Sequence, residues 1–403
     1  MRHAPSLAER AARPAAPPPP SRDYAISLVQ KAEGLRPHVE AWDDLARHAL
    51  EPNAFNEPWC FLPAMEAFAG PEAFVLLVFA PDGQMAGFFP LATRRLHPLV
   101  PLTVLESWRH VYSFLTIPLV RAGHEARVLS IVFDWFRASG HGASLWRLER
   151  MSGDGPFARS LADLCRERQR PVFVSESHNR AFMTKHPDGA DAYLDRALSK
   201  KRAREVRRKD RSLAGKGRLE HRLVGPEEDC SSWAEDFLAL EAAGWKGREG
   251  TALASHPRHA GWFRATVRDG HASGRLQLTG LYLDERPIAL KCNYLCPPGA
   301  FAFKIAYDES MHAQSPGVVL ENDNIARFHA APELCWMDSC AVPGHPMIDK
   351  LWTERRLVQD LWVATGRKPG DLAVSLMPLA RWLKRLVCPP RNTAPLSPPS
   401  EEP

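Results

Sequence analysis

The 403-residue sequence contains no apolar run long enough to cross a membrane. A spanning helix needs about 20 mostly apolar residues, and the longest candidate, residues 128–136, is interrupted by Asp134. Residues 1–23 are rich in Ala, Pro and Arg and lack the apolar segment of a secretory signal. We therefore expect a disordered leader at 1–23, no transmembrane segment and a cytoplasmic protein.

The cysteines also lack a metal-ligand pattern. Cys292 and Cys296 are separated by three residues, and Cys335 and Cys340 by four. Neither pair is accompanied by the second pair or the histidines that a structural zinc site needs. We expect buried free thiols in a reducing compartment and no bound metal.

The sequence also lacks a large excess of one charge sign, because its formal net charge is only +5. A nucleic-acid partner would need the cations to be concentrated on one surface. The hydrophobic share of 45% and the charged share of 25% are those of an ordinary globular protein. A chain of this length is expected to form two domains.

The predicted elements follow the same order in both halves. In the first half the pattern predicts a hairpin, a helix, a strand, a helix and a strand, at 74–91, 124–139, 144–148, 156–168 and 171–175. In the second half it predicts a hairpin, a third strand, a helix, a strand, a helix and a strand, at 276–294, 301–306, 316–330, 334–337, 347–365 and 372–376. This repetition favours a duplicated α/β unit.

The repeat predicts an N-terminal unit over 24–190, a C-terminal unit over 191–388 and a disordered tail over 389–403. A basic segment at 196–211 lies between the halves, and only Glu205 and Asp210 oppose its cations. Its cations suit a solvated face, a site for an anionic acceptor such as a sugar nucleotide, or RNA. RNA ranks third, because no aromatic residues are interleaved for base stacking, and no DNA partner is expected.

Four features of the second half occur in a recognisable order: the basic helix, EAAGWKG at 241–247, KIAYD at 304–308, and SPG at 315–317 followed by Leu320. Together they resemble the CelD-type acetyltransferase-like family, associated with bacterial cellulose biosynthesis, of the GNAT superfamily. That family is similar to the Fem-type aminoacyl transferases. The resemblance implies an α/β (α+β) fold of two tandem GNAT-like units, each a mixed, mostly antiparallel sheet flanked by helices. The first unit would be degenerate, and the basic helical segment would lie between the two.

The resemblance further implies where a donor binds. In a GNAT fold the loop before a helix and the start of that helix hold the pyrophosphate of acyl-CoA, because the helix dipole and free N–H groups face an anion. The matching residues here are Gln314, Ser315 and Gly317, with Ser315 suited to the N-cap and Pro316 to the first helical position. Typical members have a Gln or Arg followed by two glycines, and this sequence has one. A tRNA-dependent aminoacyl transferase of Fem type and a non-catalytic GNAT-like binding protein therefore stay open as alternatives.

Three residues are candidates for catalysis. Acyl transfer needs a base near the acceptor and an acid for the leaving thiolate. Tyr307 and Asp308, at the end of a predicted strand, suit these roles, and Asp338 follows the strand where an open sheet usually has its crevice. Each also has a purely structural reading, in a solvated turn or a loop cap.

Four more residues are candidates for binding the acceptor: Trp245, Lys246, Lys304 and Arg355. Lys304 stands in an apolar strand, where a lysine is seldom buried without a partner. Arg355 is expected on the helix 347–365, where it would bind an anion or pair with Glu354. The resemblance alone implies an acetyl-CoA or other acyl-CoA donor and a saccharide or amino-sugar acceptor of envelope or exopolysaccharide synthesis.

The C-terminal segment 379–387 places Arg381, Lys384 and Arg385 beside Leu and Trp. A packed terminal helix is the first expectation for this segment. Peripheral contact with a membrane surface is the alternative.

Overall fold

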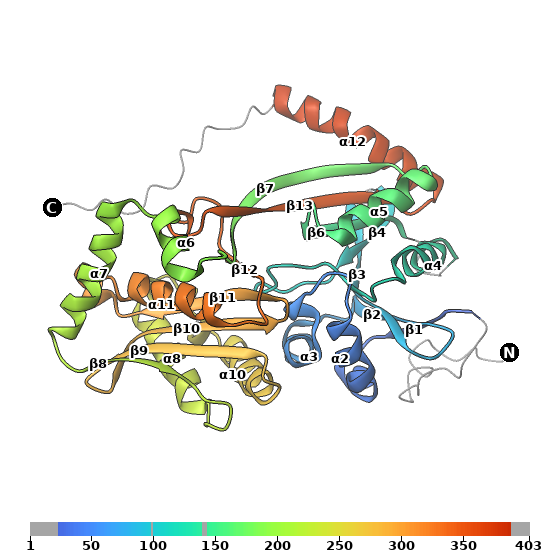
Figure 1. The fold of residues 1–403 in the computed structure, drawn as a ribbon. Helices are drawn as coiled ribbons and strands as arrows, with labels where there is room; N and C mark the ends of the chain where they lie inside the picture. The colour runs from blue at the N-terminus through green and yellow to red at the C-terminus, as the bar shows by residue number, and fades with distance from the viewer. Residues whose placement is uncertain (1–22, 98–99, 139–142, 388–403) are drawn as a thin grey trace.

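The computed structural model describes residues 23–97, 100–138 and 143–387 (Figure 1). The expected leader, apart from Asp23, and the expected tail lie outside these residues. The strands are β1 (Ala25–Val29), β2 (Ala73–Phe79), β3 (Met85–His97), β4 (Val100–Ser107), β5 (Leu119–Val120), β6 (Ala143–Ser152), β7 (Val172–Thr184), β8 (Leu219–Leu223), β9 (Leu276–Leu283), β10 (Arg286–Cys296), β11 (Gly299–Tyr307), β12 (Trp336–Asp338) and β13 (Glu354–Ala364).

The helices alternate with these strands. They are α1 (Ala32–Leu35), α2 (Val39–Arg47), α3 (Pro58–Phe68), α4 (Glu125–Ala138), α5 (Pro156–Glu167), α6 (Gly189–Ala197), α7 (Lys200–Ala214), α8 (Ser231–Ala243), α9 (Trp245–Arg248), α10 (Pro257–Ala272), α11 (Pro316–Ala330) and α12 (Lys368–Val387). Short 3₁₀ turns include η3 (Ala54–Asn56), η5 (Glu309–Gln314) and η6 (Ile348–Lys350). The basic segment 196–211 covers the last two residues of α6, the short connection at 198–199 and most of α7, and the expected basic helix is α7.

The described strands form one 13-stranded mixed sheet, in the order β1-β2-β3-β4-β6-β13-β7-β12-β11-β10-β9-β8, with β5 beside β3. Each half has one parallel pair, β4 with β6 and β11 with β12, and the other pairs are antiparallel. The last strand of each half crosses over: β13 pairs with β6, and β7 pairs with β12. The predicted boundary at 190/191 therefore divides the chain but not the sheet, because the two halves exchange strands.

Two predicted elements of the second half are wrong. The helix expected at 347–365 is the short turn η6 followed by strand β13. A bulge between Asp360 and Leu361 breaks the two-residue alternation of β13, so that its apolar residues mimic helical spacing. The strand expected at 372–376 belongs to helix α12. A short apolar run does not distinguish a strand from part of a buried helix.

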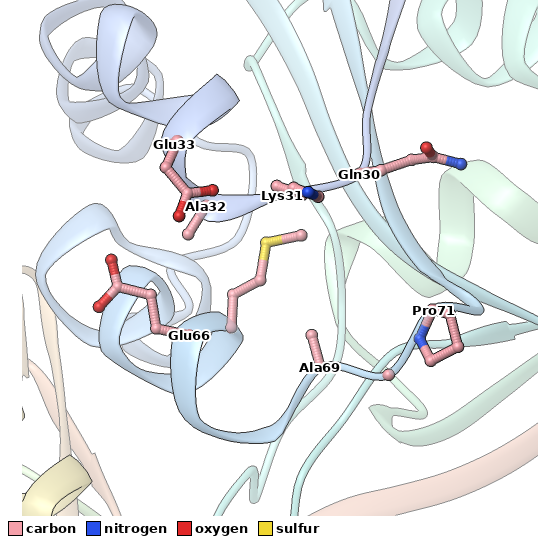
Figure 2. A pocket seen from close by; sticks show the side chains of 9 residues that line it. Gln30, Lys31, Ala32, Glu33, Glu66, Ala69 and Pro71 are labelled. Atoms are coloured by element: carbon pink, nitrogen blue, oxygen red, sulfur yellow. The ribbon is translucent and has the colours of Figure 1, made fainter. Parts of the chain in front are cut away.

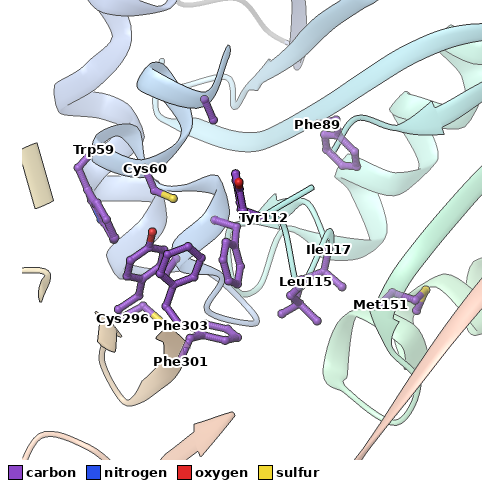
Figure 3. Packing of buried hydrophobic residues seen from close by; sticks show 14 of the residues in the cluster. Trp59, Cys60, Phe89, Tyr112, Leu115, Ile117, Met151, Cys296, Phe301 and Phe303 are labelled. Carbon is purple, nitrogen blue, oxygen red and sulfur yellow. The ribbon is translucent and has the colours of Figure 1, made fainter. Parts of the chain in front are cut away.

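The largest apolar core is shared by the two halves (Figure 3). Phe55, in the first half, lies with its ring centroid 5.1 Å from that of Phe301 on β11. Trp59 on α3 meets Tyr294 on β10 edge to face, at 4.9 Å. Aromatic contacts of this kind contribute about 0.5–1.5 kcal/mol beyond the area that they bury. The halves thus stabilise each other through a common core.

The described cysteines are free, and all of them except Cys335 are buried. Cys60 and Cys296 lie in the shared core, where burial raises the pKa of both thiols well above its usual value. Within the described ranges, no group of three or more His, Cys, Asp or Glu side chains could hold a metal ion. Over the same residues, no helix has both the length and the apolar character that a membrane-crossing segment needs.

Candidate active site

The parallel pair of the second half opens at one end. β11 pairs with β12 only from Gly299 to Phe301, and β11 then continues to Tyr307 without that neighbour. In open α/β sheets, ligands bind at the carboxyl ends of such strands. Beside this end lies a small cavity of about 30 Å³, lined among others by Glu241, Trp245, Lys246, Tyr307 and Glu309.

Glu241 is the centre of a buried cluster at this opening. It comes from α8, and its Oε1 accepts from the ammonium groups of Lys304 at 2.9 Å and Lys246 at 3.0 Å. Its Oε2 accepts from the backbone N–H of Leu253 at 2.8 Å. The side chains of Glu241 and Lys304 are only 2% and 11% exposed. The two lysines predicted from the sequence, Lys246 and Lys304, therefore donate to the same carboxylate oxygen.

Burial and charge act against each other in this cluster. Burial would raise the pKa of Glu241, but Lys304, Lys246 and the Leu253 N–H outweigh it and hold the pKa below its usual value. For Lys304, burial and the Lys246 ammonium lower the pKa, with Glu241 opposing them. Two ammonium groups facing one carboxylate leave one positive charge at the opening.

Replacing Glu241 by glutamine is expected to lower the free energy of unfolding by about 3 kcal/mol, since it leaves a buried ammonium group beside a second one. Because the pKa of Glu241 is lowered by folding, its contribution is present above pH 4.5, the usual value, and is lost as the pH falls through the lowered pKa. Urea unfolding of both proteins at neutral and acidic pH measures this. An equal difference at both pH values would contradict the assignment.

The first half contributes Tyr112 to this cluster. The Lys304 ammonium lies 5.2 Å from the centroid of the Tyr112 ring, in cation–π range. The Tyr112 hydroxyl is 2.9 Å from Nδ1 of His259 on α10. Burial, followed by the charge of Glu241, raises the pKa of Tyr112 to about 12, so this hydroxyl stays protonated. The opening is therefore built from both halves.

Tyr307 and Asp308 lie at the end of β11, as predicted. The Tyr307 ring lies against Gly317 of α11, where a Cβ would come within 3.0 Å of the ring. Burial and the Glu309 carboxylate raise the pKa of Tyr307. Asp308 is held by its neighbours, since Oδ1 accepts from the Ser310 N–H and Oδ2 from Arg286.

Trp245, also predicted from the sequence, lies at the same opening and is positioned there by Glu309. Glu309 Oε1 accepts from the backbone N–H of Trp245 at 2.7 Å, and its Oε2 from Arg248 at 2.8 Å. The Trp245 side chain is 47% exposed. An exposed indole fixed at its backbone offers a flat apolar surface to a ligand.

Helix α11 begins at the predicted pyrophosphate loop. Pro316 occupies its first turn as predicted, but Ser315 has φ 48° and ψ 60°, in the left-handed region, and its side chain does not cap the helix. The Ser315 hydroxyl instead donates to the carbonyl of His312 and accepts from the ammonium of Lys209 at 2.8 Å. Gln314, half-buried, ends the preceding turn η5, and Gly317 is buried. Since Lys209 belongs to α7, the basic helix brings an ammonium group to the start of α11, and Glu205, one turn earlier, lies 3.4 Å from that group.

The structure places the other two predicted residues elsewhere. Asp338 is fully buried and paired with Arg180 and Arg356. Arg355 lies on strand β13, contrary to the predicted helix, and donates to the carbonyls of Trp352 and Glu354. The alternative ion pair of Arg355 with Glu354 is wrong, because the Glu354 carboxylate pairs with Arg196.

Sequence reasoning missed four residues of the opening, namely Lys209, Glu241, Glu309 and Tyr112. Glu241 carried a usable signal, because it lies three and four residues after Leu238 and Phe237, which share the buried face of α8. An acidic residue on a buried helix face needs a cationic partner. Tyr112 carried no such signal, since only the folded chain brings it to Lys304.

A larger hollow of about 420 Å³ lies in the first half, beside α1 and α3 (Figure 2). Its lining includes Lys31, Glu33 and Glu66, and Glu66 pairs with Arg36. None of the sequence-predicted site residues lines it. Size alone therefore does not make it the site.

The opening at β11 lies within a segment that matches a known family. Residues 200–338, which hold α7, α8, β11 and α11, match the family model described as "Acetyltransferase (GNAT) domain". No curated protein sequence matches the chain. Among solved structures, FemX is similar with a TM-score of 0.55 at 10% identity, covering 81% of this chain and 95% of that one.

Two other solved structures are similar. A conserved protein of unknown function from Bacteroides thetaiotaomicron matches with a TM-score of 0.51 at 8% identity, covering 84% of this chain and 99% of that one. A tandem GNAT protein of the clavulanic acid pathway matches with a TM-score of 0.41 at 15% identity, covering 85% and 99%.

The expected mixed α/β fold class is confirmed, because the sheet is mixed and mostly antiparallel, helices flank it, and residues 200–338 match a GNAT domain. The matched domain supports a transferase. At such low identity the solved structures show the fold alone.

Proposed function

We propose that this protein transfers an acyl group from acyl-CoA to an amine or hydroxyl of a saccharide or amino-sugar acceptor. The observation that carries the proposal is the start of α11. This helix start lies inside the segment that matches the GNAT domain, and no side chain caps it among the described residues. The Lys209 ammonium donates a hydrogen bond to the neighbouring Ser315 hydroxyl. Pro316 has no N–H, and the N–H groups of Val318 and Val319 donate to the Ser315 carbonyl, so the Gly317 N–H is the donor at this helix start that is left for a ligand. Together with the helix dipole and the nearby Lys209 ammonium, it suits the pyrophosphate of a CoA donor.

The reaction would take place between Tyr307 and the Glu241 cluster. The acceptor nitrogen or oxygen attacks the thioester carbonyl carbon, its bond to that carbon forms, and the carbon–sulfur bond breaks. The acceptor proton leaves to Asp308 or water, and the departing thiolate takes a proton from the Tyr307 hydroxyl. Acid and base groups placed in this way contribute about 10²–10⁴-fold to a rate.

The charge of the opening favours an anionic acceptor. Lys304 and Lys246 together exceed Glu241 by one positive charge, and Trp245 offers a surface on which a sugar ring can stack. A sugar nucleotide or a lipid-linked sugar phosphate combines these two properties. The CelD-type resemblance of the second half adds envelope or exopolysaccharide synthesis as the setting.

Calorimetric titration with acetyl-CoA and longer acyl-CoAs tests the donor. We expect saturable binding, weakened about tenfold in Lys209→Ala, because a charge near a helix start and a phosphate contributes about 1–2 kcal/mol. Arg208→Ala is the matched control, since it removes one cation from the exposed surface of the same helix. If no acyl-CoA binds, or if both variants weaken binding equally, the proposed donor site is wrong.

A tRNA-dependent aminoacyl transfer is the second candidate. The observation that favours it is the exposed basic surface of α7, which includes Arg204 and Arg208. Filter binding with bulk tRNA at several salt concentrations separates the two candidates, because phosphate contacts make affinity fall steeply with salt. Salt-sensitive tRNA binding without acyl-CoA binding would favour this candidate. Binding of neither would favour a non-catalytic GNAT-like protein.

A further inference from the structure

Helix α12 carries apolar residues on two opposite faces. Val374 and Met377 pack against Phe173 and Trp362 of the sheet. The other face displays four leucines at spacings of four, three and four residues, which place them on one stripe. They are Leu372, Leu376, Leu379 and Leu383, each 47–62% exposed.

The position of the helix leaves this leucine stripe accessible. α12 contacts β6, β7 and β13 and, in Figure 1, its C-terminal end diverges from these strands. Arg381 holds the helix to the sheet by donating to the carbonyl of Val174 on β7, at 3.2 Å. The inner face therefore has its partner within the protein, while no described residue covers the outer face.

The composition of α12 indicates what covers the stripe. From Leu372 to Val387 the sequence contains three cations, Arg381, Lys384 and Arg385, and no Asp or Glu. Trp382, 57% exposed, is a neighbour of the leucines. Leucines, an exposed tryptophan and cations without acids are the composition of helices that lie in a membrane interface. A basic helix of this composition is attracted to anionic headgroups, and its exposed leucines suit the acyl boundary.

We propose that the leucine stripe of α12, together with Trp382, docks on the surface of an anionic lipid bilayer. A second copy of the chain is the alternative occupant, and light scattering distinguishes it from a bilayer. The residues that follow, 388–403, contain one large apolar residue, Leu396, and two glutamates, so they offer no apolar face to the stripe. This inference is independent of the proposed transferase activity.

Vesicle flotation with the full chain tests the docking. We use vesicles of phosphatidylcholine alone and of phosphatidylcholine mixed equally with phosphatidylglycerol. The protein is expected to float with the anionic vesicles, and less so at high salt. The double variant Leu376→Ser, Leu383→Ser is expected to lower the bound fraction about tenfold or more, since it removes two side chains that would be buried in the bilayer.

A matched control and an independent measurement keep the result clear. Val342→Ser changes an apolar residue that is 70% exposed and lies outside α12, so it should float like the unmodified protein. Thermal unfolding should be unchanged in both variants, because the substituted side chains are exposed. Failure to float with anionic vesicles, equal flotation with neutral ones, or no loss in the double variant would overturn the proposal. Light scattering would also overturn the proposal if the unmodified protein is a dimer and the double variant is a monomer. The stripe would then be a contact between two copies of the chain.

Discussion

Replacing Asp338 by alanine is expected to lower the free energy of unfolding by about 3–5 kcal/mol, the largest stability change that we predict. The carboxylate is fully buried, and its Oδ2 accepts from Arg180 at 2.8 Å and from Arg356 at 3.1 Å. Its Oδ1 accepts from the backbone N–H of Cys340. Loss of the carboxylate would leave two buried guanidinium groups facing each other.

The position of these arginines explains the size of the effect. Arg180 on β7 and Arg356 on β13 are direct partners in the antiparallel register of the two exchanged strands. Like charges directly opposite each other destabilise a sheet. Two carboxylates neutralise this pair of arginines. Asp338 bonds both of them, and Glu51 lies 2.8 Å from Arg356. The network thus permits the strand exchange that joins the two halves.

Urea unfolding measures the change, with two controls. Asp338→Asn keeps the size of the side chain and should still be strongly destabilised, because the lost charge is what matters. Glu66→Ala removes an exposed ion pair with Arg36 and should shift stability by less than about 1 kcal/mol. An Asp338→Ala protein as stable as the Glu66→Ala protein would show that the arginines find other partners.

Replacing Tyr307 by phenylalanine is expected to lower kcat about 10²-fold while the Kd for acyl-CoA stays unchanged. The hydroxyl is the proposed proton donor to the departing thiolate, whereas the ring keeps its place against Gly317 in the variant. Because burial and Glu309 raise its pKa, Tyr307 retains its proton at neutral pH, as an acid must. An interaction made only during the reaction affects kcat and leaves donor binding intact.

Release of free thiol from acetyl-CoA, with glucosamine 6-phosphate as an anionic probe acceptor, measures kcat, and calorimetry measures Kd. Tyr24→Phe is the matched control, since Tyr24 bonds His124 in the first half, outside the opening. If Tyr307→Phe keeps full kcat, the thiolate takes its proton from elsewhere. If the variant instead weakens acyl-CoA binding, Tyr307 contributes to donor binding and not to proton transfer.

The sequence alone determined the local elements and the order in which they repeat. Turn residues and two-residue alternation marked the hairpins at 74–91 and 276–294, and Pro316 marked the start of α11, because such signals act within a few residues. The motif at 304–308 and the basic segment pointed to the two elements, β11 and α7, that meet at α11. Both are properties of neighbouring residues, which the sequence displays directly.

Only the tertiary structure decided which residues meet. The crossing of β7 and β13 brings Arg180, Asp338 and Arg356 together, and the shared core carries Tyr112 to Lys304. Hydrophobic periodicity carries no information about which distant strands pair. The bulge in β13 also gave the apolar residues of that strand the spacing of a helix. The two faces of α12 also could not be told apart from the sequence, because a stripe of leucines is typical of a face packed in the core. Only the fold shows that nothing in the described chain covers this stripe.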